Sequence, residues 1–408
     1  MGGVNDLQRL VDGLGRTTRR AVAVTDVKGR ILAYSSHHGE IDEVRRTSIL
    51  TRQTPTKSLA WSRSHGIETS PGPVRVPANA DLGMAGRLCA PVRHDGRLLG
   101  YLWLVEGEPA LPEATYDAVQ AAADSAAFAL HREQVLEVIE RGHERELLRD
   151  LLSGVPEQCE QAADELVERD LCTSGPVVVL VARPVRDRAP MRREDGDVRA
   201  AVERALGQAR QGLGRRAALQ LVRHDHGLLV LSTDAFRGDG VAIVARALHD
   251  GLSAALDGLP AGWRPVVGVG DTAPELARMP ASHRQALQAA SAGALVESFG
   301  PVTRWAQLGV YQTLLSLPLG ELSPGALHPG LNTLLGLRDS AIWLDTLETW
   351  FDLGGDARAS AAVLSVQRGT LYHRLNRIEE LASVDLGKGD DRLALHLGLK
   401  LMRLAGLR

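Results

Sequence analysis

The chain opens with apolar residues at helical spacing and continues with two stretches in which apolar and polar residues alternate. Leucine and valine recur every three or four positions over 7–14, which predicts a helix. The stretches 21–36 and 88–106 alternate with a period of two, with turns at Gly29 and Gly96. They predict two β-hairpins, each with one buried face.

A helical segment over 48–65 and a Pro/Gly-rich loop over 70–83 separate the two hairpins. Two hairpins around such an insert resemble the small sensor sheets of GAF or PAS domains. A long helical pattern then covers 114–153, with Gly142 as a position where it could be interrupted. Such a helix would span roughly 60 Å at about 1.5 Å per residue. Since it cannot bury its own apolar face, we expect it to pack on a partner chain and to join two domains.

Strand and helix patterns alternate between about residue 155 and residue 300. After a helix at 159–169, the order is strand 176–184, helix 197–212, strands 217–225 and 227–233, helix 240–256, strand 264–270 and helix 281–295. This βαββαβ order predicts a ferredoxin-like α+β sheet.

The region from about 301 to the C-terminus has only helical patterns. The predicted helices are 341–353 with Ser340 as N-cap, 357–364 with Asp356 as N-cap, 367–381 after a turn at 365–366, and 392–404 with Asp390 or Asp391 as N-cap. The predicted fold class is therefore multidomain α+β, with an all-α C-terminal region.

Composition limits the possible functions. A chain of 408 residues predicts two or three domains, and a net charge of −3 means that any nucleic-acid site must be local. Three widely spaced cysteines, Cys89, Cys159 and Cys172, favour a reducing compartment. The N-terminus has no signal-peptide pattern and the apolar runs are too short to span a membrane, so we expect a cytoplasmic protein without membrane contact.

The stretch 365–381, SVQRGTLYHRLNRIEEL, combines an apolar stripe with concentrated positive charge. Leu371, Leu375 and Ile378 share one helical face and should pack inward. Residues 357–378 contain four arginines and no acidic residue. Together with the small Ala361 on the preceding short helix, this pattern predicts a helix–turn–helix whose second helix enters a DNA groove. The alternative is an amphipathic surface helix with solvated arginines.

The segment 344–404 resembles the C-terminal helix–turn–helix of PucR/CdaR-type bacterial transcriptional regulators. Their recognition helix opens close to H-R-N-T-x-x-x-R-L-x-x-I-E, and this chain departs at Gln367 and Gly369. QRGTL also resembles the Fis-type recognition helix, which implies that Arg368 contacts a base and that Thr370 and His373 contact phosphates. The candidate DNA-binding residues are Arg358, Gln367, Arg368, Thr370, Tyr372, His373, Arg374, Asn376 and Arg377.

Upstream, 146–154 and 300–315 resemble the segments that flank the family's middle domain, itself a degenerate GGDEF-like domain. The equivalent hairpin, 223–231, has only Asp225 as an acidic residue and lacks the double glycine. Two-metal phosphoryl chemistry needs more carboxylates, so we expect no enzyme activity. The predicted domains are a GAF/PAS-like sensor (1–130), a connecting signalling helix (131–154), a degenerate GGDEF-like domain (155–318) and a PucR-type helix–turn–helix domain (319–408).

Other candidate sites are weaker. His224 and His226 alternate to one strand face and could bind a metal, but without a third ligand they are interpreted as a surface pair. No metal site and no cofactor is therefore predicted. The strand positions suggest that an effector pocket in the sensor is lined by aromatic and apolar residues, namely Tyr34, Trp61, Leu88, Tyr101 and Trp103.

These patterns predict a homodimeric or higher-oligomeric transcription regulator that binds double-stranded DNA and responds to an unidentified small-molecule effector. Two alternatives stay open. One is a signalling adaptor whose C-terminal helices bind a protein with an acidic surface. The other is a nucleotide cyclase built on the middle domain.

Overall fold

A computed structural model describes residues 2–36, 41–106, 111–186, 189–190, 192, 195–260, 262–317 and 328–407. The chain divides into two compact units, Met1–Gly142 and His143–Arg408. No helix among the described residues has both the length and the apolar character needed to cross a membrane. The predicted fold class, multidomain α+β, is confirmed.

The first unit is built on one antiparallel five-stranded sheet in the order β2-β1-β5-β4-β3. Its strands are β1 (Val22–Asp26), β2 (Ile31–Tyr34), β3 (Val74–Val76), β4 (Arg87–His94) and β5 (Arg97–Val105). Its helices are α1 (Gly2–Thr18), α2 (Glu43–Thr51), α3 (Thr56–Ser64) and α4 (Ala114–Leu151), with a 3-10 turn, η1, at Ala80–Leu82. Both predicted hairpins, β1–β2 and β4–β5, are confirmed.

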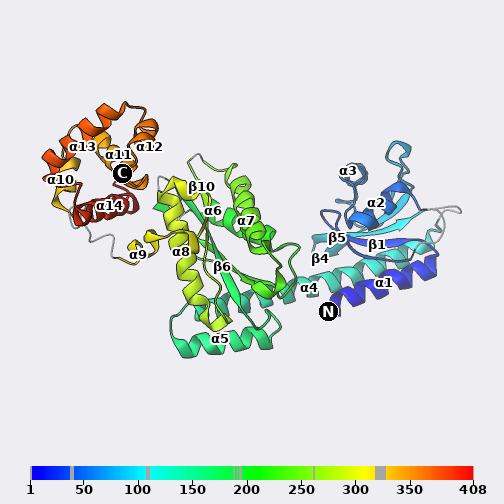
Figure 1. Cartoon of the computed structure of the whole chain (residues 1–408). Coiled ribbons are helices and arrows are strands. Elements are labelled where there is room, and N and C mark those ends of the chain that lie inside the picture. The colour runs from blue at the N-terminus through cyan, green and yellow to red at the C-terminus, as the bar shows by residue number, and fades with distance from the viewer. Residues whose placement is uncertain are drawn as a thin grey trace. The chain divides into compact units, whose positions relative to one another are not determined.

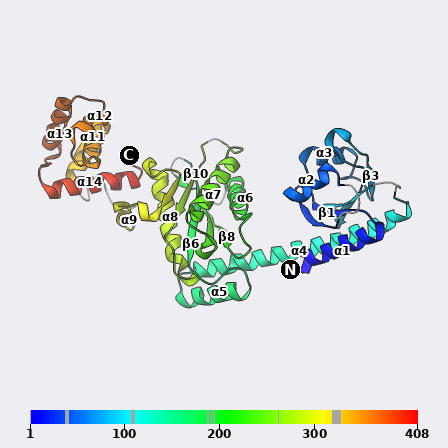
Figure 2. The ribbon, with the colours of Figure 1, turned by 45° about the vertical axis from the view of Figure 1, so that its right-hand side comes forward.

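The sheet is covered on both faces. In Figures 1 and 2, α1 and α4 lie side by side along one face, and α2 and α3 lie on the other. Leu7 and Val119 belong to the core between the sheet and the α1–α4 pair, whereas Val44 and Leu59 belong to the core under α2 and α3. Cys89 is fully buried in the second core.

Three expectations for this unit were wrong. The predicted helix over 48–65 is two helices, because the chain turns at Arg52, whose φ is 53°, and α3 then begins at Thr56 after its N-cap Pro55. The predicted loop over 70–83 contains β3, whose three residues are too few for a period to show. Gly142 does not interrupt α4, because one glycine inside a long helix costs only about 1 kcal/mol.

The second unit contains a sheet in the order β11-β10-β6-β9-β8, with β7 paired to β6. Its strands are β6 (Val177–Arg186), β7 (Ala189–Pro190), β8 (Ala218–Val222), β9 (Gly227–Ser232), β10 (Arg264–Val269) and β11 (Val302–Arg304). The path β10-β6-β9-β8 is antiparallel throughout, and β11 joins β10 in parallel. This confirms the predicted ferredoxin-like arrangement.

Helices cover both faces of this sheet. They are α5 (Pro156–Glu168), α6 (Gly196–Arg210), α7 (Gly240–Leu256) and α8 (Met279–Leu295). Helix α9 (Val310–Leu314) packs against α8 instead, and the 3-10 turns are η2 (Thr233–Ala235), η3 (Leu276–Arg278), η4 (Glu297–Phe299) and η5 (Trp305–Gln307). The alternation in β6 separates the two cores. Val179 faces the core with α5 and α8, and Leu180 faces the core with α6 and α7. Gly268 lets α8 approach, since a Cβ there would lie 1.9 Å from the Ala286 carbonyl oxygen.

The C-terminal region contains α10 (Pro329–Leu335), α11 (Ser340–Asp352), α12 (Ala357–Val363), α13 (Arg368–Ala382) and α14 (Gly389–Leu404). The expectation that 301–408 is entirely helical was wrong, because β11 extends the middle sheet. Two predicted N-caps were also wrong. Ser340 is the first residue of α11, and Asp390 and Asp391 lie in the first turn of α14, after Lys388. The boundary placed at 318–319 lies outside the described residues.

Candidate nucleic-acid interface

Helices α12 and α13 form a compact pair joined by a tight turn. The Asp356 carboxylate caps α12, accepting hydrogen bonds from the backbone N–H groups of Arg358 at 2.7 Å and Ala359 at 3.0 Å. Those bonds lower the pKa of Asp356, with a smaller contribution from Arg368 and Arg358. Ser365 then takes a left-handed conformation, φ 54°, which ends α12 and redirects the chain into α13.

The apolar stripe of α13 holds this helix against the rest of the domain. Leu371, Leu375 and Ile378 are all buried, as their spacing predicts. Ala361 of α12 is 4% exposed and packs with Leu371 and Leu375. A small residue at this crossing lets the two helices approach closely, so the predicted helix–turn–helix geometry is present.

Most candidate DNA-binding residues lie on the exposed side of this pair. Those that are exposed are Arg358, Gln367, Arg368, Thr370, Tyr372, His373, Asn376 and Arg377. Arg374 is different, because it is half-buried and its Nη1 lies 3.5 Å from Thr346 Oγ1 on α11. Gln367 precedes α13 as its N-cap, so the first turn of the helix begins at Arg368.

The positive charge on this face is not equally available. Arg377 Nη1 lies 2.7 Å from Glu380 Oε2, one helical turn away, and both side chains are exposed. Arg358 and Arg368 lie near Asp356, whose carboxylate is already engaged with two backbone donors. The cationic surface therefore centres on the N-terminal end of α13 and the facing part of α12.

A buried ion-pair network behind this face was not predicted from the sequence. Glu348 of α11 is 3% exposed, and Arg403 of α14 binds it through two nitrogens at 2.5 and 2.7 Å. Lys400 Nζ lies 3.3 Å from Glu348 and 2.6 Å from Asp352. The only sequence signal is opposite charge on two amphipathic helices. The network fixes α11 to α14, and so supports α13 from behind.

The hairpin of the middle domain differs from a metal site. Interpreting His224 and His226 as a surface pair was wrong for His226, which is 2% exposed. Its Nε2 lies 3.0 Å from His283 Nε2, and its Nδ1 lies 2.7 Å from Asp225. Burial, and then His226, lower the pKa of His283 to about 3. The described residues contain no group of three or more side chains that could hold a metal ion.

Asp225, the one carboxylate of this hairpin, is also occupied. Burial tends to raise its pKa, but the hydrogen bond with His226 and the nearby charges outweigh burial and lower the pKa to about 2. Arg183 lies 3.8 Å away on β6. The carboxylate is therefore tied into a local network.

Family models match two segments of this chain. Residues 343–401 match the PucR C-terminal helix-turn-helix domain, and residues 153–292 match the GGDEF-like domain. The first match contains the α12–α13 pair, and the second contains the ferredoxin-like sheet up to α8.

The chain is also similar to characterised regulators. It is 21% identical to the DNA-binding transcriptional activator AdeR of Bacillus subtilis (strain 168), over 98% of this chain and 93% of AdeR. It is 22% identical to the proline-responsive transcriptional activator PutR of the same organism, over 98% of this chain and 97% of PutR. It is 36% identical to the carbohydrate diacid regulator of Escherichia coli (strain K12), over 22% of this chain and 23% of that protein.

Proposed function

From the premise that the chain is a PucR/CdaR-type DNA-binding transcriptional regulator, we propose that α13 reads double-stranded DNA and that the N-terminal domain senses a small molecule. The observation that carries the first part is the exposed cationic face of α12 and α13, which lacks acidic residues over 357–378. Such a face fits the phosphate backbone, whose counterions basic side chains displace. Because its target is chromosomal DNA, the protein acts in the cytoplasm of a bacterium.

Within this face, we propose a role for each residue from its position along α13. Arg368 opens the helix and is exposed, so it enters the major groove first and its forked donors match guanine O6 and N7. Gln367 lies beside it and offers the amide pair suited to adenine. The remaining exposed candidates hold the backbone, and Arg374 supports the helix from within through Thr346.

We propose four functional segments with the boundaries drawn from the sequence: a sensor over 1–130, a connecting helix over 131–154, a middle domain over 155–318 and a DNA-binding domain over 319–408. The middle domain serves as a structural and signalling element without nucleotide turnover. Asp225, the acidic residue of its hairpin, is bound to His226 and faces Arg183, which leaves no free carboxylate there for a metal ion.

The protein is proposed to act as a homodimer through α4. In an isolated chain, the middle of this helix has five large apolar side chains exposed to solvent, namely Phe128, Val135, Leu136, Val138 and Ile139. Phe128, Val135 and Ile139 follow the seven- and four-residue spacing of a coiled-coil seam. Pairing two chains along this seam would present two recognition helices to half-sites about 34 Å apart, or a multiple of that distance.

The test is selection of bound sequences from random duplex DNA by the full chain. We expect enrichment of a two-fold-related site whose binding weakens as salt rises. Arg368→Ala should lose about 1–3 kcal/mol of discrimination at one base position. Arg338→Ala, an exposed arginine outside the helix pair, is the matched control. Absence of salt-dependent DNA binding would refute the proposal and favour the protein adaptor. Magnesium-dependent GTP turnover would favour the cyclase.

A further inference from the structure

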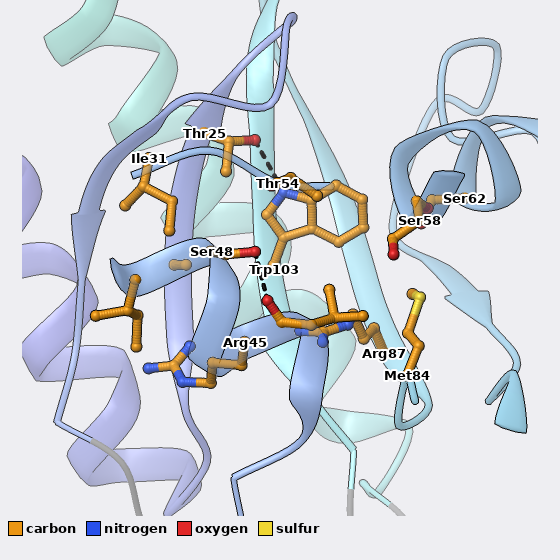
Figure 3. A pocket seen from close by; sticks show the side chains of 13 residues that line it. Thr25, Ile31, Arg45, Ser48, Thr54, Ser58, Ser62, Met84, Arg87 and Trp103 are labelled. Atoms are coloured by element: carbon orange, nitrogen blue, oxygen red, sulfur yellow. Dashed lines mark hydrogen bonds between the residues drawn. The ribbon is translucent and has the colours of Figure 1, made fainter. Parts of the chain in front are cut away.

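The N-terminal domain contains a cavity between its sheet and the helices α2 and α3. Its empty space amounts to about 440 Å³, a value that includes the part open to solvent. Figure 3 shows Trp103 of β5 at its centre, Ser48 of α2 on one side, and Ser58 and Ser62 of α3 on the other. Of the five residues suggested by the sequence as pocket lining, only Trp103 lines this cavity.

Two of the residues that line the cavity are charged, namely Arg45 from α2 and Arg87 from β4. None of the described lining residues is acidic. Both lie below Ser48 and Trp103 in Figure 3. Arg45 is 4% exposed and Arg87 is 7% exposed. Two guanidinium groups buried this deeply need counter-charges, because an unpaired buried cation is strongly unfavourable.

One acidic residue, Asp42, serves Arg87. The Nη2 atom of Arg87 lies 2.9 and 2.7 Å from the two carboxylate oxygens of Asp42. The same carboxylate also caps α2 through the backbone N–H of Arg45 at 2.6 Å and binds the N–H of Ala85 at 3.1 Å. Asp42 is thus fully used in holding α2 to β4.

Arg45 has a weaker set of partners. Its Nη2 donates only to the backbone carbonyl of Ser35 at 2.9 Å, whereas Arg87 has the Asp42 carboxylate; the Nε atoms of both arginines are buried without a hydrogen-bond partner among the described residues. Burial, and then the neighbouring Arg87, lower the pKa of Arg45 to about 10, so it stays cationic at neutral pH. The cavity wall therefore carries one positive charge more than its side chains neutralise.

The other residues that line the cavity indicate which groups, besides an anion, a ligand would need. Ile31, Met84 and the indole of Trp103 supply apolar surface. The Ser48 and Ser62 hydroxyls donate their protons to backbone carbonyls at 2.6 and 2.9 Å, so their oxygens are left as acceptors. The cavity complements an anion with a small apolar body that carries a hydrogen-bond donor.

We propose that this cavity is the sensor's effector site, and that it binds a small organic acid whose carboxylate pairs with Arg45 and whose apolar part lies against Trp103. This inference rests on the function proposed above and names the chemical class of its signal. Arg87 has a different part, because its charge is already matched and it fixes the wall.

The first experiment is hydrogen exchange by mass spectrometry on the full chain with 3-methylbutanoate, 2-hydroxy-3-methylbutanoate or benzoate, each at about 10 mM, beside the matching uncharged amides. A ligand that binds only the folded domain slows its exchange. We expect at least one acid to protect peptides from α2, α3 and β5, and its amide to have no effect. If none of the acids protects them, or an amide protects equally, the proposal is overturned.

Two variants on the same helix give the matched control. Arg45→Met keeps the length of the side chain and should abolish the protection. Arg46→Met, one residue along, removes an exposed arginine paired with Glu43 and should preserve it. Protection that persists in Arg45→Met would place the acid elsewhere.

The ligand-free proteins give a readout that does not depend on the chosen acids. If Arg45 is kept for a ligand rather than for the fold, Arg45→Met should leave exchange in the sensor unchanged or make it slower. Faster exchange would assign Arg45 a structural role and overturn the proposal. DNA binding by Arg45→Met separates the two proposals, since retained binding leaves the regulator function intact whatever happens at the cavity.

Discussion

The arginines at the two ends of the chain face opposite environments. On α12 and α13, Arg358 and Arg368 lie on an exposed surface, where any anion that reaches them keeps most of its own hydration. In the sensor, Arg45 and Arg87 lie inside a cavity, where each unmatched charge is costly. The difference in exposure between the two pairs of arginines therefore favours a different kind of anion for each pair. The first pair suits a long polyanion that many weak contacts hold, and the second suits one small anion that a single strong contact selects.

The largest expected effect comes from breaking the matched buried pair. Arg87→Met leaves the Asp42 carboxylate buried without its paired guanidinium, which should cost the sensor about 3–5 kcal/mol. Hydrogen exchange in β4 and β5 should speed up accordingly. Asp42→Ser in the same chain removes the orphaned charge but retains an N-capping side chain for α2. The double variant should recover most of the loss; if it does not, the charge pair is not the cause.

The next prediction tests whether Arg368 recognises a base or only attracts the phosphate backbone. Arg368→Lys keeps the positive charge but loses the forked donor pair that matches guanine. We expect about 1–3 kcal/mol less discrimination at one base position, with the salt dependence of binding almost unchanged. Binding titrations on the selected site and on single-base variants measure both quantities. Arg338→Lys should change neither. An equal loss on all sequences would make Arg368 a phosphate contact.

The sequence predicts the DNA-binding face but not the cavity. The difference lies in how far apart along the chain the contributing residues are. The interface is a local pattern: Leu371, Leu375 and Ile378 define the buried face of one helix, and the exposed residues follow from it. The cavity is not local, because Arg45 and Arg87 come from a helix and a strand that only the sheet order brings together. For the same reason, the sequence does not predict the contact of Glu348 with Arg403 or that of His226 with His283.

The middle domain adds a third case, the half-buried His283, which the fold keeps uncharged. The pKa of His283 falls to about 3 in the folded chain, against about 6.5 when unfolded. The unfolded chain therefore binds the extra proton between these values, and stability is lost as pH falls from about 6.5 toward 3. We expect the middle domain to lose roughly 1–2 kcal/mol between pH 7 and pH 5.

Hydrogen exchange in β9, β10 and α8 at the two pH values measures this loss. Asp225 does not contribute in that window, because its folded pKa of about 2 places its own loss at lower pH. His283→Asn should flatten the dependence, whereas His224→Asn, an exposed histidine on the same hairpin, should not. An unchanged slope in His283→Asn would move the titrating group elsewhere.

The smallest effect concerns an arginine that stands between the two extremes. Arg377 is exposed like Arg368, yet Glu380 one turn away already neutralises it. An exposed pair of this kind is worth only about 0.3–0.5 kcal/mol, so DNA can displace the glutamate easily. Glu380→Ala should therefore strengthen DNA binding by a few tenths of a kcal/mol at low salt, equally on all sequences. Removing Arg377 as well should reverse the gain. If Glu380→Ala instead weakens binding, Glu380 orients Arg377 toward the phosphates and does not compete with them.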